Sequence, residues 1–284
     1  MKEWKSPIPR TINLIWIGTN PYPDYMIEFV KSFNKYLPEF NLRIWSNNDL
    51  NKDNFPKTYK YIQKIKKIHG KQMYDSDGNK MYDRFMKPIV YSKWAQITDL
   101  MRLELIYNNG GYYFDINFEI LKPLYNILNI NNEFVGCNEV PRFRDFHSLS
   151  NSFFGAIKKS PILKRMLLKS TLDKIDIYNP YVDNETGPGF LRRHIDENKD
   201  NIHIFPTSYF YPFVEEYSPS QKNPPYRKSS KNKCHSIKYK KGYMKLKNNK
   251  GYIQYPCKSY PKSYAIKHWN LGKSWLNFLE YYTK

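Results

Sequence analysis

The sequence predicts an α/β fold in which helices flank a Rossmann-like sheet, and three observations lead to this prediction. Two short apolar runs near the N-terminus enclose a stretch of helical periodicity, as in a strand-helix-strand unit. Further along, a second helical pattern stops at a double glycine, and an aromatic run typical of a buried strand follows. The length of 284 residues with 40% hydrophobic content suits one large α/β domain or two small ones.

The strand-helix-strand unit opens the chain. A first buried strand is expected between Ile8 and Gly18, and a second one from Leu42 to Trp45. The helix between them is expected to bury one face, made of Ile27, Val30, Phe33 and Leu37. Because parallel sheets bind ligands beyond the carboxyl ends of their strands, Trp16 is either a core aromatic residue or a flat platform for a nucleobase.

Residues 56–90 are rich in Lys, Tyr and Asp and predict an irregular segment. It contains a D-x-D sequence at Asp75 to Asp77, but no apolar strand leads into it. We therefore interpret this sequence as an exposed turn.

A helix is predicted from Ser92 onward, with an apolar stripe and a separate polar row. The polar row contains Asp99 and Arg102, three positions apart. They could form a surface ion pair worth about 0.2 to 0.5 kcal/mol. Alternatively, Asp99 accepts hydrogen bonds from sugar hydroxyls and Arg102 binds phosphate or ribose oxygens. The apolar stripe consists of Trp94, Ile97, Met101 and Leu105.

The central stretch of the chain runs from Ile106 to Glu119. The double glycine, Gly110 and Gly111, suits the left-handed conformation that ends a helix, and a strand is expected to follow it. If that strand continues, alternation places Asp115, Asn117 and Glu119 on one face. Such a row of oxygen atoms either binds a hard cation or is the wet face of an edge strand.

Downstream, the sequence predicts an amphipathic helix from Pro161 to Leu172 and a strand from Tyr264 to Trp269. Thr186, Gly187 and Pro188 predict a helix start, whose N–H groups could contact a ligand oxygen or could simply begin the helix. Asp183 and Glu185, just before it, are candidate carboxylates for an acceptor site.

The chain carries a formal net charge of +20 and has a pI near 9.6. These values predict attraction to anions, whether nucleic acid, an anionic membrane, an acidic glycan or a phosphorylated small molecule. Not one Asp or Glu occurs from Tyr217 to Leu279. Residues 217–262 are therefore interpreted as a basic insertion, either a solvated segment or a surface for an anionic acceptor or a membrane.

The three cysteines fall far apart and have no C-x-x-C spacing, which fits either a reducing compartment or inert thiols. No stretch approaches the roughly 20 apolar residues of a membrane span. We therefore expect a soluble, cytoplasmic protein that makes at most peripheral contact with a membrane.

Three motifs together resemble the DXD-bearing glycosyltransferase family 32, and more distantly the glucosylating domains of the large clostridial toxins. They are Trp16-Ile17-Gly18 after the first strand, A-x-x-x-D-x-x-R from Ala95 to Arg102, and G-G-x-Y-x-D from Gly110 to Asp115. The resemblance implies a GT-A fold, a mixed sheet flanked by helices, in a single domain over residues 1–284. It also implies retaining transfer of a hexose from a UDP- or GDP-linked sugar to a glycan or other hydroxyl acceptor.

The resemblance further implies roles for individual residues. Catalysis is expected from Asp99, Arg102, Asp115 and Asn117. The implied donor-binding residues are Trp16, Ile17, Asp99, Arg102, Gly111, Asp115, Gly187, Ser274 and Trp275. A Mn²⁺ or Mg²⁺ ion is expected on Asp115, Asn117 and His268.

Asn117 departs from the family pattern, which has a second Asp at this position. An amide oxygen carries no negative charge and binds a divalent cation more weakly, so the metal requirement is in question. This departure leaves open a catalytically weak or dead relative that binds nucleotide sugars or glycans. A basic nucleic-acid-binding protein is the remaining alternative, although the sequence has no nucleic-acid module signature.

Overall fold

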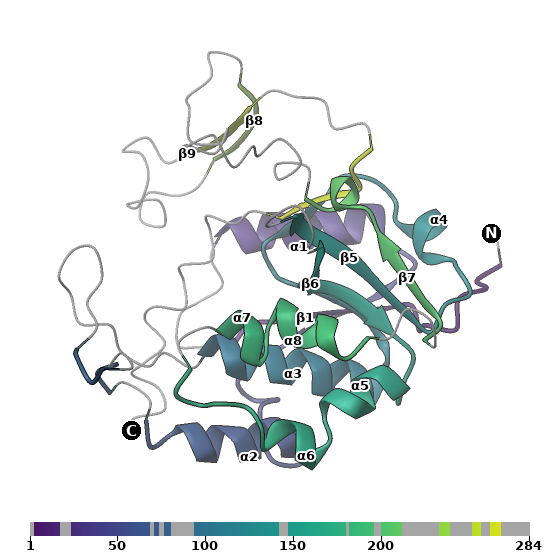
Figure 1. The fold of residues 1–284 in the computed structure, drawn as a ribbon. Coiled ribbons are helices and arrows are strands. Elements are labelled where there is room, and N and C mark those ends of the chain that lie inside the picture. Colours follow the sequence, from purple (N-terminus) through teal and green to yellow (C-terminus); the bar gives the residue numbers. More distant parts are fainter. Residues whose placement is uncertain are drawn as a thin grey trace.

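The computed structural model describes residues 3–17, 24–68, 71–73, 77–80, 94–141, 147–179, 182–195, 200–211, 233–238, 252–256 and 262–267 (Figure 1). Its elements, in chain order, are β1 (Thr11–Ile15), α1 (Asp24–Tyr36), β2 (Asn41–Trp45), α2 (Pro56–Ile65), α3 (Trp94–Asn109), β3 (Gly111–Phe114), β4 (Phe118–Ile120), α4 (Tyr125–Leu128), β5 (Phe134–Pro141), β6 (His147–Ala156), α5 (Pro161–Met166), α6 (Lys169–Leu172), α7 (Val182–Glu185), α8 (Pro188–Arg193), β7 (Ile202–Phe205), the 3-10 helix η1 (Thr207–Tyr209), β8 (Lys233–Lys238), β9 (Tyr252–Pro256) and β10 (Ala265–Lys267).

A six-stranded mixed sheet forms the centre of the fold, in the order β2-β1-β3-β6-β5-β7. Strand β1 is parallel to β2 and β3, and β5 is parallel to β7. Strand β6 is antiparallel to both of its neighbours, β3 and β5. The predicted fold class, α/β with a mixed sheet flanked by helices, is confirmed.

Two hydrophobic clusters cover the two faces of this sheet, and β3 contributes to both. Tyr112 and Phe114 pack into the cluster that includes Phe33 of α1. Tyr113 points the other way, into the cluster that contains Met101 of α3 and residues of α2, α5 and α8. Figure 1 shows the corresponding layers, with α3, α5 and α8 on one side of the sheet and α1 on the other. Because both faces of β3 are covered, the position of its carboxyl end is fixed.

Most predicted elements of the N-terminal half are present, and two details of the prediction are wrong. Ile27 is 47% exposed, whereas Met26 and Phe29 are buried in the face of α1 that meets the sheet. Residues 56–65 are helical rather than irregular, because Thr58, Tyr61, Ile62 and Ile65 form a buried face at helical spacing. The start of this helix, α2, is held by the Glu104 carboxylate, which accepts hydrogen bonds from the backbone N–H groups of Lys57 (3.0 Å) and Thr58 (2.8 Å).

Two further corrections concern places where a predicted strand or helix is interrupted. The alternation predicted from Asp115 to Glu119 is wrong, because the chain turns after β3 and the N–H of Phe118 donates to the carbonyl of Asp115 (3.1 Å). The helix predicted from Pro161 to Leu172 is divided into α5 and α6, because Leu168 has an extended backbone conformation. The turn predicted near Asp75 is described from residue 77 on, where residues 77–80 are exposed.

The C-terminal part of the chain contributes two small antiparallel sheets. Strand β10 pairs with β4, so it lies next to the turn that follows β3. Strands β8 and β9 pair with each other. They fall within the predicted basic insertion, of which residues 217–232, 239–251 and 257–261 lie outside the described residues. The division of the chain into domains stays a prediction.

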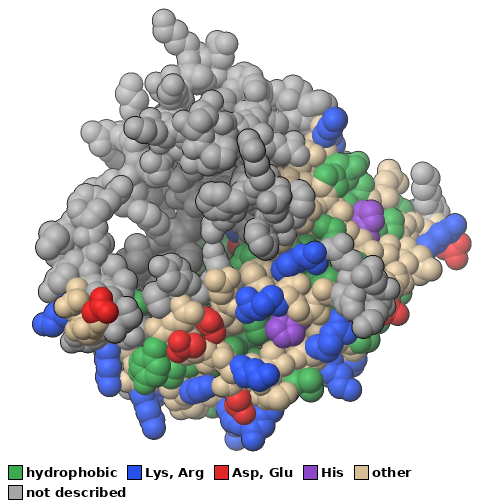
Figure 2. Space-filling model, viewed as in Figure 1, with side chains coloured by type: hydrophobic (Ala, Val, Ile, Leu, Met, Phe, Trp, Pro, Cys, Tyr) green, Lys and Arg blue, Asp and Glu red, His purple; other side chains and the backbone are tan. Residues whose placement is uncertain are grey.

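The described surface outside residues 217–262 is also basic. Figure 2 shows Lys and Arg side chains spread over the face formed by the helices α5, α6 and α8, with few acidic side chains among them. Exposed examples are Lys164, Lys169, Arg192 and Arg193. Within the described part of the chain, no helix is both long and apolar enough to cross a membrane.

Gly111 provides a test of the packing that fixes β3. Its φ is +92°, and a Cβ atom there would lie 2.6 Å from the backbone oxygen of Thr11 on β1. We expect Gly111→Ala to lower the free energy of unfolding by roughly 3 kcal/mol, since a backbone atom must move in addition to the conformational strain. Urea unfolding followed by circular dichroism measures this change.

Gly78 is a matched control, because its φ is +81° but a Cβ atom there would meet nothing within 4 Å. Gly78→Ala should therefore cost only the conformational term, about 1 to 2 kcal/mol. Equal losses in the two variants would contradict the close approach of β1 and β3.

Candidate active site

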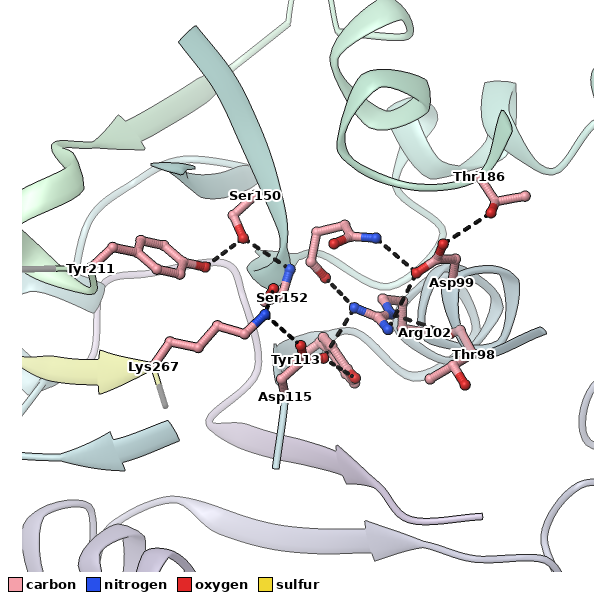
Figure 3. Close-up of polar contacts among 11 residues, drawn as sticks. Thr98, Asp99, Arg102, Tyr113, Asp115, Ser150, Ser152, Thr186, Tyr211 and Lys267 are labelled. Carbon is pink, nitrogen blue, oxygen red and sulfur yellow. Dashed lines mark hydrogen bonds and ion pairs between the residues drawn. The ribbon is translucent and has the colours of Figure 1, made fainter. Parts of the chain in front are cut away.

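Asp115 lies directly after β3, at the carboxyl edge of the parallel strands β1 and β3 (Figure 3). Its Oδ1 accepts hydrogen bonds from the hydroxyl of Tyr113 (2.7 Å) and from Nη1 of Arg102 (3.1 Å). Its Oδ2 accepts from Nζ of Lys267 (2.8 Å). The side chain remains 22% exposed. The carboxylate is thus bound by two cations, one on each oxygen, at the rim of the sheet.

Arg102 connects helix α3 to two strands. Its Nη1 also donates to the backbone oxygen of Asn151 on β6 (2.8 Å), and its Nε donates to the carbonyl of Thr98 (3.2 Å). Nη2 lies 3.3 Å from Oδ1 of Asp99, and Cζ lies 4.7 Å from the centre of the Tyr113 ring. Because Asp99 and Arg102 are both buried, they are not the surface ion pair that their spacing also allowed.

Asp99 extends the network from α3 to α8. Its Oδ1 accepts from the amide of Asn151 (2.8 Å) and its Oδ2 from the hydroxyl of Thr186 (2.9 Å). Thr186 directly precedes Gly187, the residue before the first turn of α8. The predicted T-G-P helix start is therefore present, and the hydroxyl of Thr186 joins it to the predicted polar row.

Lys267 reaches the same point from the C-terminal part of the chain. Strand β10 pairs with β4 in a register that places Lys267 opposite Phe118, one residue after Asn117. Besides Asp115, the ammonium group contacts the hydroxyl of Ser152 on β6. Figure 3 shows the resulting sequence of side chains, with Lys267 on one side of Asp115 and Arg102 on the other. The sequence predicts a strand at this place, but the predicted metal ligand on it is His268, the residue next to Lys267.

Burial and charge set the protonation states in this network. Burial raises the pKa of Asp115, but Lys267 and Arg102 outweigh it and lower the pKa to about 2. Burial lowers the pKa of Arg102. The opposite effect of Tyr113, Asp115 and Asp99 is larger, so the net shift of this pKa is upward. Burial raises the pKa of Tyr113 well above 10. At neutral pH the network thus contains a carboxylate between two cations and a neutral phenol.

The structure brings some of the other predicted residues to this edge. The register pairs Asn13 with Tyr113, so Trp16, which follows β1, and Asp115, which follows β3, lie beyond the same edge of the sheet. Trp16 is half-buried, and its backbone N–H donates to the carbonyl of Trp45 (2.8 Å). Ile17 packs against the hydrophobic cluster that contains α3.

Other predicted residues lie elsewhere or outside the described residues. Gly111 begins β3 and is therefore at the opposite end of the strand from Asp115. The Glu185 carboxylate accepts from the N–H of Asp176 (2.8 Å) and the amide of Asn179 (2.9 Å), so it holds a neighbouring turn. The predicted residues that fall outside the described part of the chain are His268, Ser274 and Trp275.

The described side chains do not fit the predicted Mn²⁺ or Mg²⁺ site. The sole carboxylate of the motif, Asp115, already faces two cations, and Asn117 adds no charge. A divalent ion about 4 Å from the Lys267 ammonium would be repelled by about 8 kcal/mol at an effective dielectric constant of about 20. Within the described ranges, no group of three or more His, Cys, Asp and Glu side chains could hold a metal ion.

Comparison with known proteins finds a family match for the part of the chain that carries several residues of this network. Residues 23–135 match the sequence model of a family described as "Glycosyltransferase sugar-binding region containing DXD motif". This range includes Asp99, Arg102, Asp115 and Asn117. Over these residues, which are less than half of the chain, the protein resembles a glycosyltransferase. The more specific assignment to family 32 stays a prediction, and a search of curated proteins found no match.

Several solved structures resemble the fold at a distance. The PaToxG glycosyltransferase is 16% identical, with a TM-score of 0.46, over 68% of this chain and 69% of that one. The galactosyltransferase LgtC, solved with donor and acceptor sugar analogues, is 10% identical with a TM-score of 0.38, over 76% and 81% of the two chains. The catalytic domain of alpha-toxin from Clostridium novyi is 11% identical with a TM-score of 0.37, over 66% and 72%.

The lowered pKa of Asp115 predicts how stability depends on pH. The folded-state pKa of about 2 lies below the ordinary 3.8, so the stabilisation is complete above pH 3.8 and is lost as the pH falls through 2. Between pH 5 and pH 2, the wild type should lose about 2 kcal/mol that Asp115→Asn does not lose. Urea unfolding at several pH values measures the difference between the two proteins. A constant difference across this range would show that the ion pairs do not stabilise the fold.

Proposed function

We propose that this enzyme transfers a hexose from a nucleotide-diphosphate sugar, UDP- or GDP-linked, to a hydroxyl group of a glycan or another acceptor, with retention of the anomeric configuration. The donor binds at the carboxyl edge of β1 and β3. The observation that carries the proposal is the convergence of Asp99, Arg102 and Asp115 in one hydrogen-bonded network inside the region that matches the sugar-binding family.

The position of the network supports a nucleotide-sugar donor. Nucleotides bind α/β sheets beyond the carboxyl ends of parallel strands, where Asp115 lies. Trp16, at the end of β1, stacks on the base, and Ile17 lies beside it. Asp99 and Arg102 orient the sugar and ribose, since a carboxylate accepts from hydroxyls and a guanidinium donates to oxygens in fixed directions. Gly187 borders the sugar, next to Thr186.

The chemical step follows from the charges. The bond from the sugar C1 atom to the phosphate oxygen breaks, and the nucleoside diphosphate leaves with the electron pair. Positive groups stabilise the negative charge that develops on the β-phosphate. The acceptor hydroxyl attacks C1 from the same face, and its proton passes to the departing phosphate oxygen, so no side-chain nucleophile is required.

The surface charge supports an anionic acceptor. The net charge is +20, and exposed Lys and Arg side chains occupy the described face around α5, α6 and α8 (Figure 2). An acidic glycan fits this field, and so does an acceptor at an anionic membrane. A cytoplasmic location stays a prediction.

Asn117 favours a second candidate function, a relative that binds nucleotide sugars but turns them over weakly. The motif then carries one formal negative charge instead of two. Binding of UDP- or GDP-sugars without release of the nucleoside diphosphate would support this alternative, whereas multiple turnovers would exclude it.

Asp115→Asn tests the proposed active site. The amide keeps the shape of the side chain but loses the charge that holds Arg102 and Lys267, so donor turnover should fall by roughly 100-fold or more. Release of UDP or GDP from a panel of nucleotide sugars measures this effect, and circular dichroism verifies the fold.

Glu104→Gln is the matched control, because Glu104 is also a buried carboxylate that follows Arg102 on α3, yet it contacts the start of α2. This variant should lose stability and keep wild-type turnover per folded molecule. Wild-type turnover in Asp115→Asn, or equal losses in the two variants, would contradict the proposed site.

A further inference from the structure

We propose that Lys267 is a catalytic residue that binds the donor diphosphate, in place of the divalent metal ion that the family resemblance implies at Asp115 and Asn117. This inference deepens the proposed function and rests on it. It makes glycosyl transfer by this chain independent of a divalent cation.

The pairing of β10 fixes the position of Lys267 beside the turn that follows β3. Strand β10 is fixed from two sides, by its pairing with β4 and by a hydrogen bond from the N–H of Lys267 to the carbonyl of Phe210 (3.3 Å). This arrangement brings the lysine alongside Asp115 and Asn117, the residues after β3 at which the family resemblance implies a metal ion. The side chain is 7% exposed, so its ammonium group has a defined position.

The charge of Lys267 balances the charge that remains in the motif. A motif with two aspartates carries two negative charges, which a divalent ion neutralises. Here Asn117 leaves a single negative charge on Asp115, and the single positive charge of Lys267 neutralises it at 2.8 Å. Asp99 and Arg102 form a second pair of opposite charges, 3.3 Å apart. The local sum is therefore zero with lysine and asparagine, as it would be with a metal ion and two aspartates.

The pair of Asp115 and Lys267 is accessible to a ligand. The Asp115 side chain remains 22% exposed, so the pair lies at the rim of the sheet rather than inside a sealed core. A diphosphate that approaches this rim meets a preorganised ammonium group, whose three N–H groups can be shared between a carboxylate and phosphate oxygens. In the transfer step the lysine stays protonated and stabilises the charge on the leaving β-phosphate, while the proton of the acceptor goes to the phosphate oxygen.

The test compares binding and turnover with and without metal. Wild-type affinity for UDP and GDP is measured by calorimetry in EDTA and in MnCl₂, and donor turnover is measured in the same buffers. We expect diphosphate binding and turnover in EDTA at levels within about threefold of those in MnCl₂.

Substitution of Lys267 provides an independent readout. Lys267→Met should weaken binding of the diphosphates in EDTA by roughly 10- to 100-fold, toward the affinity for the monophosphates UMP and GMP, because a charge-assisted hydrogen bond is lost. Lys267→Arg should recover part of this loss. Lys122→Met is the matched control: it removes a cation that lies over the ring of Tyr264, close to β10, and should leave diphosphate affinity unchanged.

Each outcome is decisive. Binding or turnover that appears in MnCl₂ but not in EDTA would overturn the assignment of Lys267 and leave the proposed function standing. Unchanged diphosphate affinity in Lys267→Met would do the same. Should that variant fail to fold, the wild-type comparison in EDTA and MnCl₂ still decides. A wild-type protein that binds neither diphosphate nor turns over any nucleotide sugar in either buffer would contradict both proposals.

Discussion

The Asp115 carboxylate lies between two buried cations that come from distant parts of the chain, Arg102 on α3 and Lys267 on β10. A buried cation without a partner is strongly destabilising, so each of these side chains needs the carboxylate as much as the carboxylate needs them. The same three residues therefore hold a helix, the end of a central strand and a C-terminal strand together. Any ligand that binds at this edge of the sheet meets a site already fixed by charge.

The precision of the site depends on the strand that leads to it. Tyr112 and Phe114 are buried on one face of the sheet and Tyr113 on the other, so β3 has no freedom to shift without opening a hydrophobic cluster. Tyr113 also contributes its hydroxyl to Asp115 and its ring to Arg102. One side chain thus takes part in both the core and the polar network, which couples the packing of the sheet to the geometry of the carboxylate.

Local patterns predicted those parts of the fold that local patterns determine. The periodicity around Phe33 and Met101 predicted α1 and α3, and the double glycine predicted where β3 begins. Helix α2 was missed because its lysines and tyrosines conceal a buried face that includes Tyr61 and Ile65. Alternation beyond Phe114 failed because a turn hydrogen bond, which spacing does not reveal, ends the strand.

Local patterns likewise predicted only some residues of the candidate site. Asp99 and Arg102 could be found from their spacing on one helix, and Asp115 from its position after an apolar strand. Lys267 could not be found, because its importance comes from the pairing of β10 with β4, which joins residues about 150 positions apart in the sequence. Sequence reasoning therefore identified the acids of the network and one of its cations, and long-range strand pairing supplied the other.

If Lys267 replaces the metal ion, Arg102 has to contribute more to the stabilisation of the leaving diphosphate. The local charge sum is the same as with a metal ion and two aspartates, but an ammonium group brings one positive charge to the phosphate oxygens where a divalent ion brings two, so its own contact with a leaving diphosphate is weaker. The remaining stabilisation has to come from Arg102, whose guanidinium is directed by Asp99, the carbonyl of Asn151 and the ring of Tyr113. Asp99 would then influence leaving-group departure through the orientation of Arg102, in addition to any contact with the sugar. A site that relies on a lysine in place of a metal ion thus depends more strongly on the fixed geometry of its second cation.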